Sequence, residues 1–192
     1  MNKTNKTKKL TTSALMVAIA TVLVIASKMI PSVWLQGGSV TLASAVPIIM
    51  VSILYGAGWG CGAAFAFALV QMMTGFYPPP TQTLWYFFLV VMLDYILAFG
   101  VYGLAGGIYN ICRKKDFAIP LSAFCVTTLR YICHIISGIL IWGVYAEEGQ
   151  SVLAYSLIYN GSYMIPEIII TTIACTMLIP LIKRINKQEK LT

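Results

Sequence analysis

Four ionisable side chains lie inside long apolar stretches of this sequence and are the first candidates for chemistry. They are Asp94, Arg130, His134 and Glu167. A charged side chain at the centre of a membrane-spanning helix costs about 2.5–3.5 kcal/mol on insertion scales, so such residues mark binding sites, ion pathways or proton relays. A carboxylate accepts hydrogen bonds, and an imidazole gains or loses a proton near neutral pH. These residue types therefore indicate a polar binding site or a proton-transfer site at membrane depth.

Helical spacing joins part of this set into a stripe. Arg130, His134, Gly138 and Trp142 recur every fourth residue, which places them on one face of a helix. A lone histidine in a helix is more often a hydrogen-bonded packing residue than a ligand-binding one. Its companions along the same face favour a functional role here. The stripe predicts a polar and aromatic surface that runs along this helix.

A second stripe and a separate carboxylate complete the set. Asn160, Tyr163 and Glu167 share one face of a later helix, and Asp94 is followed directly by Tyr95. Aromatic faces attract cations by about 0.5–2 kcal/mol each. A carboxylate accepts hydrogen bonds from an amino group, and Asn and His side chains fix the edges of a ring. Together these residues predict a site for a small, flat, nitrogen-rich, cationic molecule.

The stretches that carry these residues are too apolar and too long for a soluble domain. Of the 192 residues, 59% are hydrophobic and 10% are charged, whereas about 25% of the residues in an ordinary soluble domain are charged. A bilayer accepts about 20 apolar residues per helix. The sequence therefore predicts an all-α integral membrane protein. Segments without Asp, Glu, Lys or Arg include 29–93, 95–112, 131–146, 149–166 and 168–182.

Six membrane spans account for the whole chain as a single membrane domain, 1–192, which leaves no room for a soluble catalytic domain. Proline and glycine clusters at 56–60 and 77–80 separate consecutive spans, because neither residue type favours a helix interior. The predicted spans are 10–30, 41–55, 59–76, 84–111, 117–145 and 159–185.

Basic residues lie at the ends of these spans and predict the orientation. With six spans, both termini, the turn at 56–60 and the loop at 113–116 fall on one side. That side holds every Lys and Arg except Lys28 and Arg130, so by the positive-inside rule both termini are cytoplasmic. The formal net charge of +7 then reflects membrane topology, and no nucleic-acid partner is expected.

Other interpretations of the same residues stay open. In one interpretation, Arg130 forms a buried structural ion pair with Glu167 or Asp94, since charges inside membranes usually pair. In another, Asp94, His134 and Glu167 form the active site of an intramembrane enzyme. In a third, Glu167 and Arg130 relay protons in a gradient-driven carrier. The five cysteines lack C-x-x-C spacing, so neither a disulfide framework nor a metal site is expected.

Three groups of residues carry a resemblance to a known family. They are Arg130, His134, Ser137, Gly138, Trp142, Tyr145, Ala146 and Gly149; then Tyr155, Ser156, Tyr159, Asn160 and Tyr163; and, earlier, Leu93-Asp94-Tyr95 with Gly103-Leu104-Ala105-Gly106. This pattern resembles the thiamine transporter (ThiT or YuaJ) family, whose members are substrate-binding S components of energy-coupling-factor (ECF) transporters. The resemblance covers the whole chain and implies a six-helix S-component fold.

The resemblance also implies a binding site for thiamine, with no other cofactor. Asp94 holds the position of the carboxylate that binds the aminopyrimidine in this family, where Glu also occurs. Trp142 matches the ring that stacks on the vitamin, and Trp34 resembles the tryptophan of an external loop that closes over it. The remaining residues implied at the site are His134, Asn160 and Tyr155 as polar contacts, Tyr95 as a stacking neighbour, and Gly138 within the same motif.

The same resemblance implies partner proteins. Ala14 and Ala18 are similar to the small-residue face by which S components dock on a transmembrane coupling subunit, and small residues let helices approach closely. The chain contains no G-x-x-x-x-G-K-[ST] motif, so two separate ATP-binding subunits are expected to supply the energy. The expected function is thiamine uptake across the bacterial plasma membrane. An S component for another vitamin, the enzyme and the carrier remain alternatives.

Overall fold

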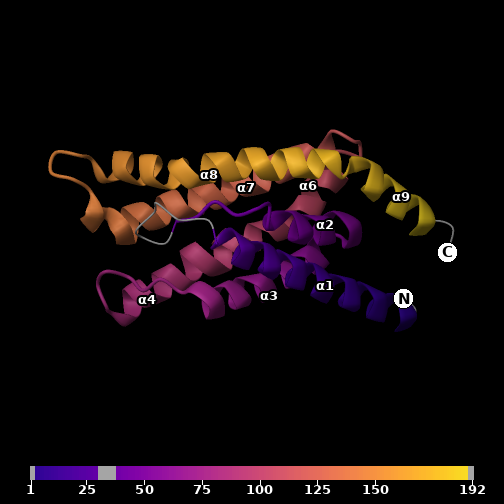
Figure 1. Cartoon of the computed structure of the whole chain (residues 1–192), viewed down its shortest axis with the longest axis horizontal. Helices are drawn as coiled ribbons and strands as arrows, with labels where there is room; N and C mark the ends of the chain where they lie inside the picture. Colours follow the sequence, from indigo (N-terminus) through magenta and orange to yellow (C-terminus); the bar gives the residue numbers. More distant parts are fainter. Residues whose placement is uncertain (1–2, 30–37, 190–192) are drawn as a thin grey trace.

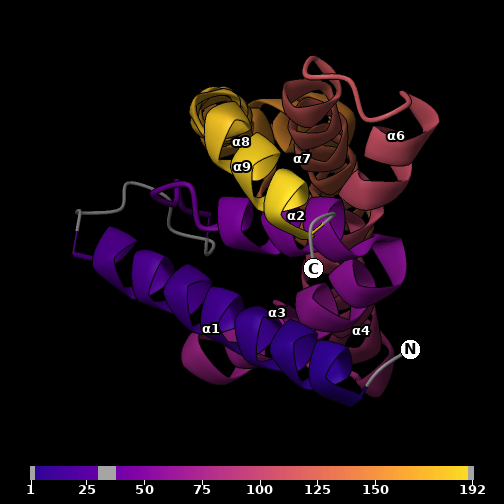
Figure 2. The ribbon, with the colours of Figure 1, turned by 90° about the vertical axis from the view of Figure 1, so that its right-hand side faces the viewer.

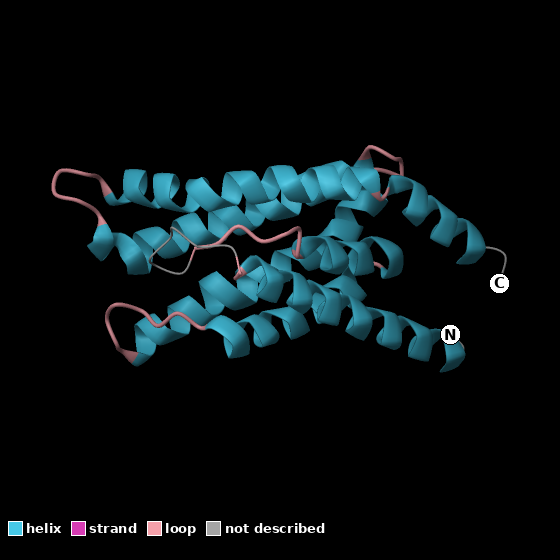
Figure 3. Cartoon of the chain, in the orientation of Figure 1, coloured by secondary structure: helices cyan, strands magenta, loops and turns pink. Residues whose placement is uncertain are grey.

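Helices make up the structure, a computed structural model that describes residues 3–29 and 38–189 (Figures 1 and 3). No strand occurs among these residues. Two stretches combine α-helical turns with wider π-helical and tighter 3₁₀ turns. The elements are α1 (Lys3–Ser27), α2 (Ala45–Tyr55), α3 (Ala57–Gly75), α4 (Leu84–Val90), π-helical η1 (Val91–Leu97), α5 (Ala98–Gly100), 3₁₀ η2 (Val101–Leu104), α6 (Ala105–Ile111), α7 (Ala118–Ser137), π-helical η3 (Gly138–Trp142), 3₁₀ η4 (Gly143–Tyr145), α8 (Val152–Met177) and α9 (Ile179–Glu189).

Four helical stretches of the described residues are long and apolar enough to cross a membrane. Lys6–Ser27, Ala57–Gly75, Leu84–Ile111 and Ala118–Tyr145 meet that description, and α8 with α9 forms a fifth stretch that bends by 48°. The remaining apolar helix, α2, has 11 residues and is therefore only about 16 Å long at 1.5 Å per residue. The prediction of an all-α membrane protein is confirmed. The number six, which counts α2 as a span, stays a prediction.

Three helices differ in their bounds from the spans predicted at the same places, and the spans themselves stay a prediction. The span expected at 41–55 begins at Ala45, because Ala43 has a left-handed φ of 57° that an α-helix does not contain. The span expected at 159–185 begins at Val152, where the Ser151 side chain caps the helix by accepting a hydrogen bond from the Ala154 N–H (3.2 Å). The first helix starts at Lys3 and ends at Ser27, because its polar first turns extend the helix beyond the apolar run.

The helices run roughly along the long axis of the molecule, and both ends of the chain lie at the same end of it (Figure 1). The loop between α3 and α4 and the loop between η4 and α8 lie at the opposite end. In two perpendicular views, α7 and α8 lie side by side, away from α1 and α3 (Figure 2). This alternation of loop positions is the one that the predicted topology requires.

Many apolar side chains face outward, as expected for a protein surrounded by lipid, and the interior combines an apolar core with buried polar groups. Ser52 on α2 is fully buried, donates to the Gly103 carbonyl (2.5 Å) and accepts from the Gly106 N–H (2.8 Å). A Cβ at Gly106 would overlap the Ser52 carbonyl, so this close approach requires glycine. Exposed apolar side chains include Leu15, Val22, Ile139, Ile158 and Ile173.

Candidate functional site

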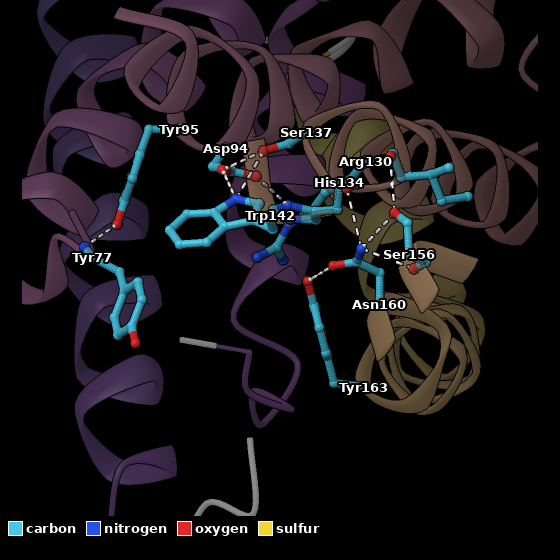
Figure 4. A network of polar contacts seen from close by, with 11 residues as sticks. Tyr77, Asp94, Tyr95, Arg130, His134, Ser137, Trp142, Ser156, Asn160 and Tyr163 are labelled. Atoms are coloured by element: carbon cyan, nitrogen blue, oxygen red, sulfur yellow. Dashed lines mark hydrogen bonds and ion pairs between the residues drawn. The ribbon is translucent and has the colours of Figure 1, made fainter. Parts of the chain in front are cut away.

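Most of the predicted site residues line a cavity between α7 and α8 on one side and α1 and α3 on the other. Figure 4 shows the polar network of several of them. The cavity lining comes from α1 and the residue after it, the segment before α2, α3 and the loop after it, α4, η1, α5, α7, η3 and α8. Gly138 starts η3 beside this lining, and Trp34 lies outside the described residues. The predicted residues that line the cavity are Asp94, Tyr95, His134, Trp142, Tyr155 and Asn160.

Asp94 is the centre of the polar network. Its Oδ1 lies 2.9 Å from His134 Nδ1, and its Oδ2 accepts hydrogen bonds from Ser137 Oγ (2.6 Å) and Trp142 Nε1 (3.1 Å). Three neighbours on α7 and η3 therefore hold one carboxylate of η1 (Figure 4). Hydrogen bonds to an ionised acceptor are about twice as strong as neutral ones, so this carboxylate is fixed in position at the cavity wall.

The buried Arg130 determines which nitrogen of His134 carries the proton. Arg130 Nε donates to His134 Nε2 (3.2 Å), so Nε2 accepts and the proton of the neutral ring lies on Nδ1, which donates to Asp94. The Arg130 guanidinium also donates to the Tyr102 hydroxyl (2.7 Å) and lies 4.5 Å from the Phe99 ring centroid. Arg130 thus orients the imidazole, which in turn orients Asp94.

Asn160 joins α8 to α7 at the same depth. Its Nδ2 donates to the His134 carbonyl (3.1 Å) and to the Ser156 carbonyl (2.9 Å), and its Oδ1 accepts from the Tyr163 hydroxyl (2.5 Å). Both amide hydrogens are therefore used within the protein. The Oδ1 keeps a second lone pair that a bound molecule can use.

Two π-helical turns carry two of the residues that meet at the cavity wall. Asp94 lies in η1, and Trp142 is the last residue of η3. π-Helical turns are rare and occur often at functional sites, because the extra residue in the turn redirects neighbouring side chains. The stripe of Arg130, His134, Gly138 and Trp142 predicted from ideal helical spacing is therefore rotated at η3, and Trp142 reaches Asp94 from there.

Aromatic rings surround the Trp142 indole. The Tyr77 ring centroid lies 5.5 Å from that of Trp142, and the Tyr145 ring stacks on Trp142 at 6.4 Å with an interplanar angle of 16°. Tyr77 belongs to the loop between α3 and α4, whereas Tyr145 ends η4. Segments far apart in the sequence thus supply a group of aromatic faces at the loop end of the cavity, suited to a flat cationic ring.

Tyr95 lines the cavity but uses its hydroxyl to fix a turn. The hydroxyl donates to the Gly75 carbonyl (3.0 Å) and accepts from the Tyr77 N–H (3.0 Å), while its ring stacks on Phe76 (5.4 Å). Tyr95 therefore holds the end of α3 in place. Its expected role as a stacking neighbour of a ligand stays a prediction.

Tyr155 differs from the other polar residues because its hydroxyl makes no hydrogen bond. The side chain is 9% exposed, and no partner for the hydroxyl occurs in the described part of the chain. Its ring stacks on Tyr159 at 5.7 Å. Buried polar atoms nearly always have a partner, so this hydroxyl at the cavity lining is a candidate to bind a ligand atom.

Gly138 allows α7 and α8 to approach at the site. A Cβ at this position would overlap Ser156 Oγ and lie 3.0 Å from Asn160 Nδ2. The contact would displace Asn160 or push the helices apart. Gly138 therefore acts through packing beneath the cavity, and it is not among the residues that line it.

The interpretation of a direct ion pair between Arg130 and Glu167 or Asp94 is wrong. Glu167 is 1% exposed, and its carboxylate accepts from the backbone N–H (2.7 Å) and the hydroxyl (2.5 Å) of Thr41. Arg130 instead binds Tyr102 and His134. Glu167 thereby anchors the segment that precedes α2.

Some members of the network were not singled out as site residues from the sequence. Ser137 donates to Asp94, and its place three residues after His134 was the available signal. Tyr77 lies against Trp142, and no pattern in its proline-rich loop indicated this. Gln71 and Lys28 also line the cavity. Among the described residues, no three His, Cys, Asp or Glu side chains lie close enough together to hold a metal ion.

The fold and the cavity together define a multi-pass membrane protein with a polar, aromatic cavity of the kind that receives a small molecule. A sequence model of the thiamine transporter protein family (Thia_YuaJ) matches residues 10–187. The chain belongs to this family, as its motifs predicted, and is a multi-pass protein of the bacterial plasma membrane.

Individual relatives agree with this assignment. Thiamine transporter ThiT of Bacillus subtilis (strain 168) is 33% identical over 201 residues, which cover 99% of this chain and 100% of the relative. ThiT of Lacticaseibacillus paracasei is 29% identical over 97 residues, 46% of this chain and 48% of the relative. A solved structure of ThiT from Listeria monocytogenes superposes with a TM-score of 0.71 at 21% identity, over 92% of this chain and 96% of that one. The overall fold is therefore that of ThiT.

Proposed function

We propose that the protein binds thiamine with high affinity in this cavity, from the extracellular side, and takes it up as the S component of an ATP-driven ECF transporter. The observation that carries the proposal is the position of Asp94. It is the one acidic side chain among the described residues that line the cavity, and His134, Ser137 and Trp142 hold its carboxylate. Membership of the thiamine transporter family supplies the identity of the ligand.

Thiamine carries groups that complement the residues of the cavity lining. Its aminopyrimidine carries an amino group and two ring nitrogens, and its thiazolium ring carries a positive charge. The Asp94 carboxylate accepts from the amino group and balances the charge of the thiazolium. The Trp142 ring stacks on a flat heterocycle, and the free lone pair of Asn160 and the hydroxyl of Tyr155 bind ring edges.

Removing the Tyr155 hydroxyl separates ligand binding from folding. Because this hydroxyl has no partner in the described part of the chain, we expect Tyr155→Phe to leave the melting temperature unchanged or to raise it. The same change lowers thiamine affinity about tenfold, the usual loss for one hydrogen bond of about 1–1.5 kcal/mol. Calorimetric titration and thermal unfolding of the purified variant measure both quantities. Tyr131→Phe is the control, since the Tyr131 hydroxyl bonds the Leu157 carbonyl on the exposed side. A fall in stability with unchanged affinity would contradict a binding role for Tyr155.

Uptake needs partners, and α1 offers a surface for one of them. Ala14 and Ala18 are both exposed and lie one turn apart on α1. Ala14 also lines a groove between α1 and α3, whose other small residues are Gly58, Gly62, Ala63 and Ala66. Small residues allow a helix of a partner to approach closely within the membrane. This surface supports docking of the transmembrane coupling subunit, which would connect the chain to two ATP-binding subunits.

Uptake by reconstituted vesicles tests the proposal. Vesicles that contain this chain, the coupling subunit and the two ATP-binding subunits are expected to accumulate labelled thiamine only with ATP. Ala14→Trp and Ala18→Trp should lower uptake at least about tenfold while leaving thiamine binding intact, because bulk at the surface blocks docking. Ile19→Trp, which adds bulk at an exposed position on a different face of α1, is the control. Uptake without the ATP-binding subunits would indicate a gradient-driven carrier. Chemical conversion of thiamine would indicate an enzyme, and uptake of a different vitamin would replace the ligand.

A further inference from the structure

The cavity has a second wall that the predicted site residues do not form. The name α3 wall is used here for four residues that line the cavity on the side of α1 and α3: Val24, Lys28, Gln71 and Gly75. Figures 1 and 2 show α1 and α3 on the opposite side of the molecule from α7 and α8. The polar residues assigned to thiamine so far lie on η1, α7, η3 and α8. A two-ring ligand held there at one end extends its other end toward the α3 wall.

Gln71 is the polar residue on this wall whose side chain is left without a partner. It is 8% exposed, and its Nε2 is buried with no hydrogen-bond partner in the residues that the structure describes. Its neighbours one turn away on α3 are Phe67 and Gly75. A buried amide that makes no hydrogen bond is unfavourable in the empty protein. Since Gln71 lines the cavity, a bound molecule can supply the missing partner.

The other polar groups on or beside this wall have partners within the protein. Lys28 Nζ donates to the Thr74 carbonyl (2.8 Å) at the end of α3. The Tyr95 hydroxyl is shared between the Gly75 carbonyl and the Tyr77 N–H. The Tyr95 ring, which also lines the cavity, stacks on Phe76.

The chemistry of thiamine then assigns its orientation. The aminopyrimidine half carries several hydrogen-bonding groups, which match the polar wall around Asp94. The thiazolium half carries one, the hydroxyl of its hydroxyethyl arm. We infer that Gln71 binds this hydroxyl and is a specificity-determining residue for the thiazolium end of the ligand. The inference rests on the proposed function, because it takes thiamine as the ligand.

A cycle of two proteins and two ligands tests this contact. The proteins are the wild type and Gln71→Met, which keeps the length of the side chain and removes the amide. The ligands are thiamine and its deoxy analogue, in which an ethyl group replaces the hydroxyethyl arm. Calorimetric titration gives the four dissociation constants. We expect Gln71→Met to weaken thiamine binding about tenfold and to leave binding of the deoxy analogue unchanged. The wild type should itself prefer thiamine to the analogue about tenfold.

Stability and two further variants complete the test. Because the Nε2 of Gln71 has no partner in the empty protein, Gln71→Met should keep or raise the melting temperature, whereas a structural role would lower it. Gln71→Asn, which withdraws the amide by one methylene, should also reduce the preference for thiamine, and it serves if Gln71→Met does not fold. Gln82→Met, at an exposed position outside the cavity, should change nothing. Equal loss for both ligands, or no loss for either, would overturn the inference. A wild type that binds neither ligand would overturn the proposed function with it.

Discussion

Asp94→Asn is expected to weaken thiamine binding about 100-fold. The carboxylate is the one acidic group among the described residues of the cavity lining, and the substitution removes its charge while keeping its shape. A charge-assisted hydrogen bond and the balance of the thiazolium charge together contribute about 3 kcal/mol, and each 1.4 kcal/mol is a tenfold change. Calorimetric titration of the purified variant measures the loss.

Two comparisons isolate the role of the charge at Asp94. Asp94→Glu keeps the charge and lengthens the side chain by one methylene, so binding should stay within about tenfold of the wild type. Asp116→Asn removes a carboxylate from an exposed pair with Lys183 at the other end of the molecule and should have no effect. Binding by Asp94→Asn as tight as the wild type would show that the carboxylate does not contact the ligand.

Trp142→Ala is expected to weaken thiamine binding to a similar extent, whereas Trp142→Phe should cost only a few-fold. The alanine removes the ring that stacks on the ligand, and a buried aromatic contact of this kind contributes about 2–3 kcal/mol. The phenylalanine keeps a ring but loses the Nε1 donor to Asp94 Oδ2 (3.1 Å). Freed from the indole, that oxygen is available to the amino group of thiamine, which offsets part of the loss.

The difference in thiamine affinity between the two Trp142 variants separates the role of the ring face from that of the indole N–H. Trp85→Ala, at a residue that is 64% exposed on α4, controls for the loss of a tryptophan elsewhere. Dissociation constants for all four proteins come from one titration series with labelled thiamine. Equal losses for Trp142→Ala and Trp142→Phe would mean that the indole N–H, and not the ring face, is what the ligand needs.

The helices could be predicted from the sequence because apolar run length and the positions of proline and glycine depend only on local composition. The predicted span at 84–111 coincides with the helical stretch Leu84–Ile111. The late start of α2 could not be predicted, because it depends on the left-handed Ala43 and on contacts of Thr41 with Glu167, far away in the sequence. The π-helical turns η1 and η3, which carry Asp94 and Trp142, could not be predicted either, because the hydrophobic pattern does not distinguish them from α-helix.

The sequence predicted which residues form the site, but not which of them bond to one another. Costly polar residues in apolar helices identified Asp94, His134 and Asn160, which line one cavity. The sequence did not reveal that Arg130 orients His134, because the choice between His134, Asp94 and Glu167 as its partner depends on the three-dimensional packing. Gln71 was missed for a different reason. A single glutamine in an apolar helix gives no sign of a function in the sequence, and only the structure shows that its amide nitrogen has no partner.

The most direct test of thiamine binding at this cavity is the intrinsic tryptophan fluorescence of the purified protein during titration with thiamine. Trp142 lies at the cavity lining beside Asp94, so a ligand that stacks on its ring changes its emission. We expect saturable quenching that fits one site with a nanomolar dissociation constant, and a much weaker response in Trp142→Ala. Fluorescence that stays unchanged up to micromolar thiamine would contradict the assignment of this cavity as the thiamine site.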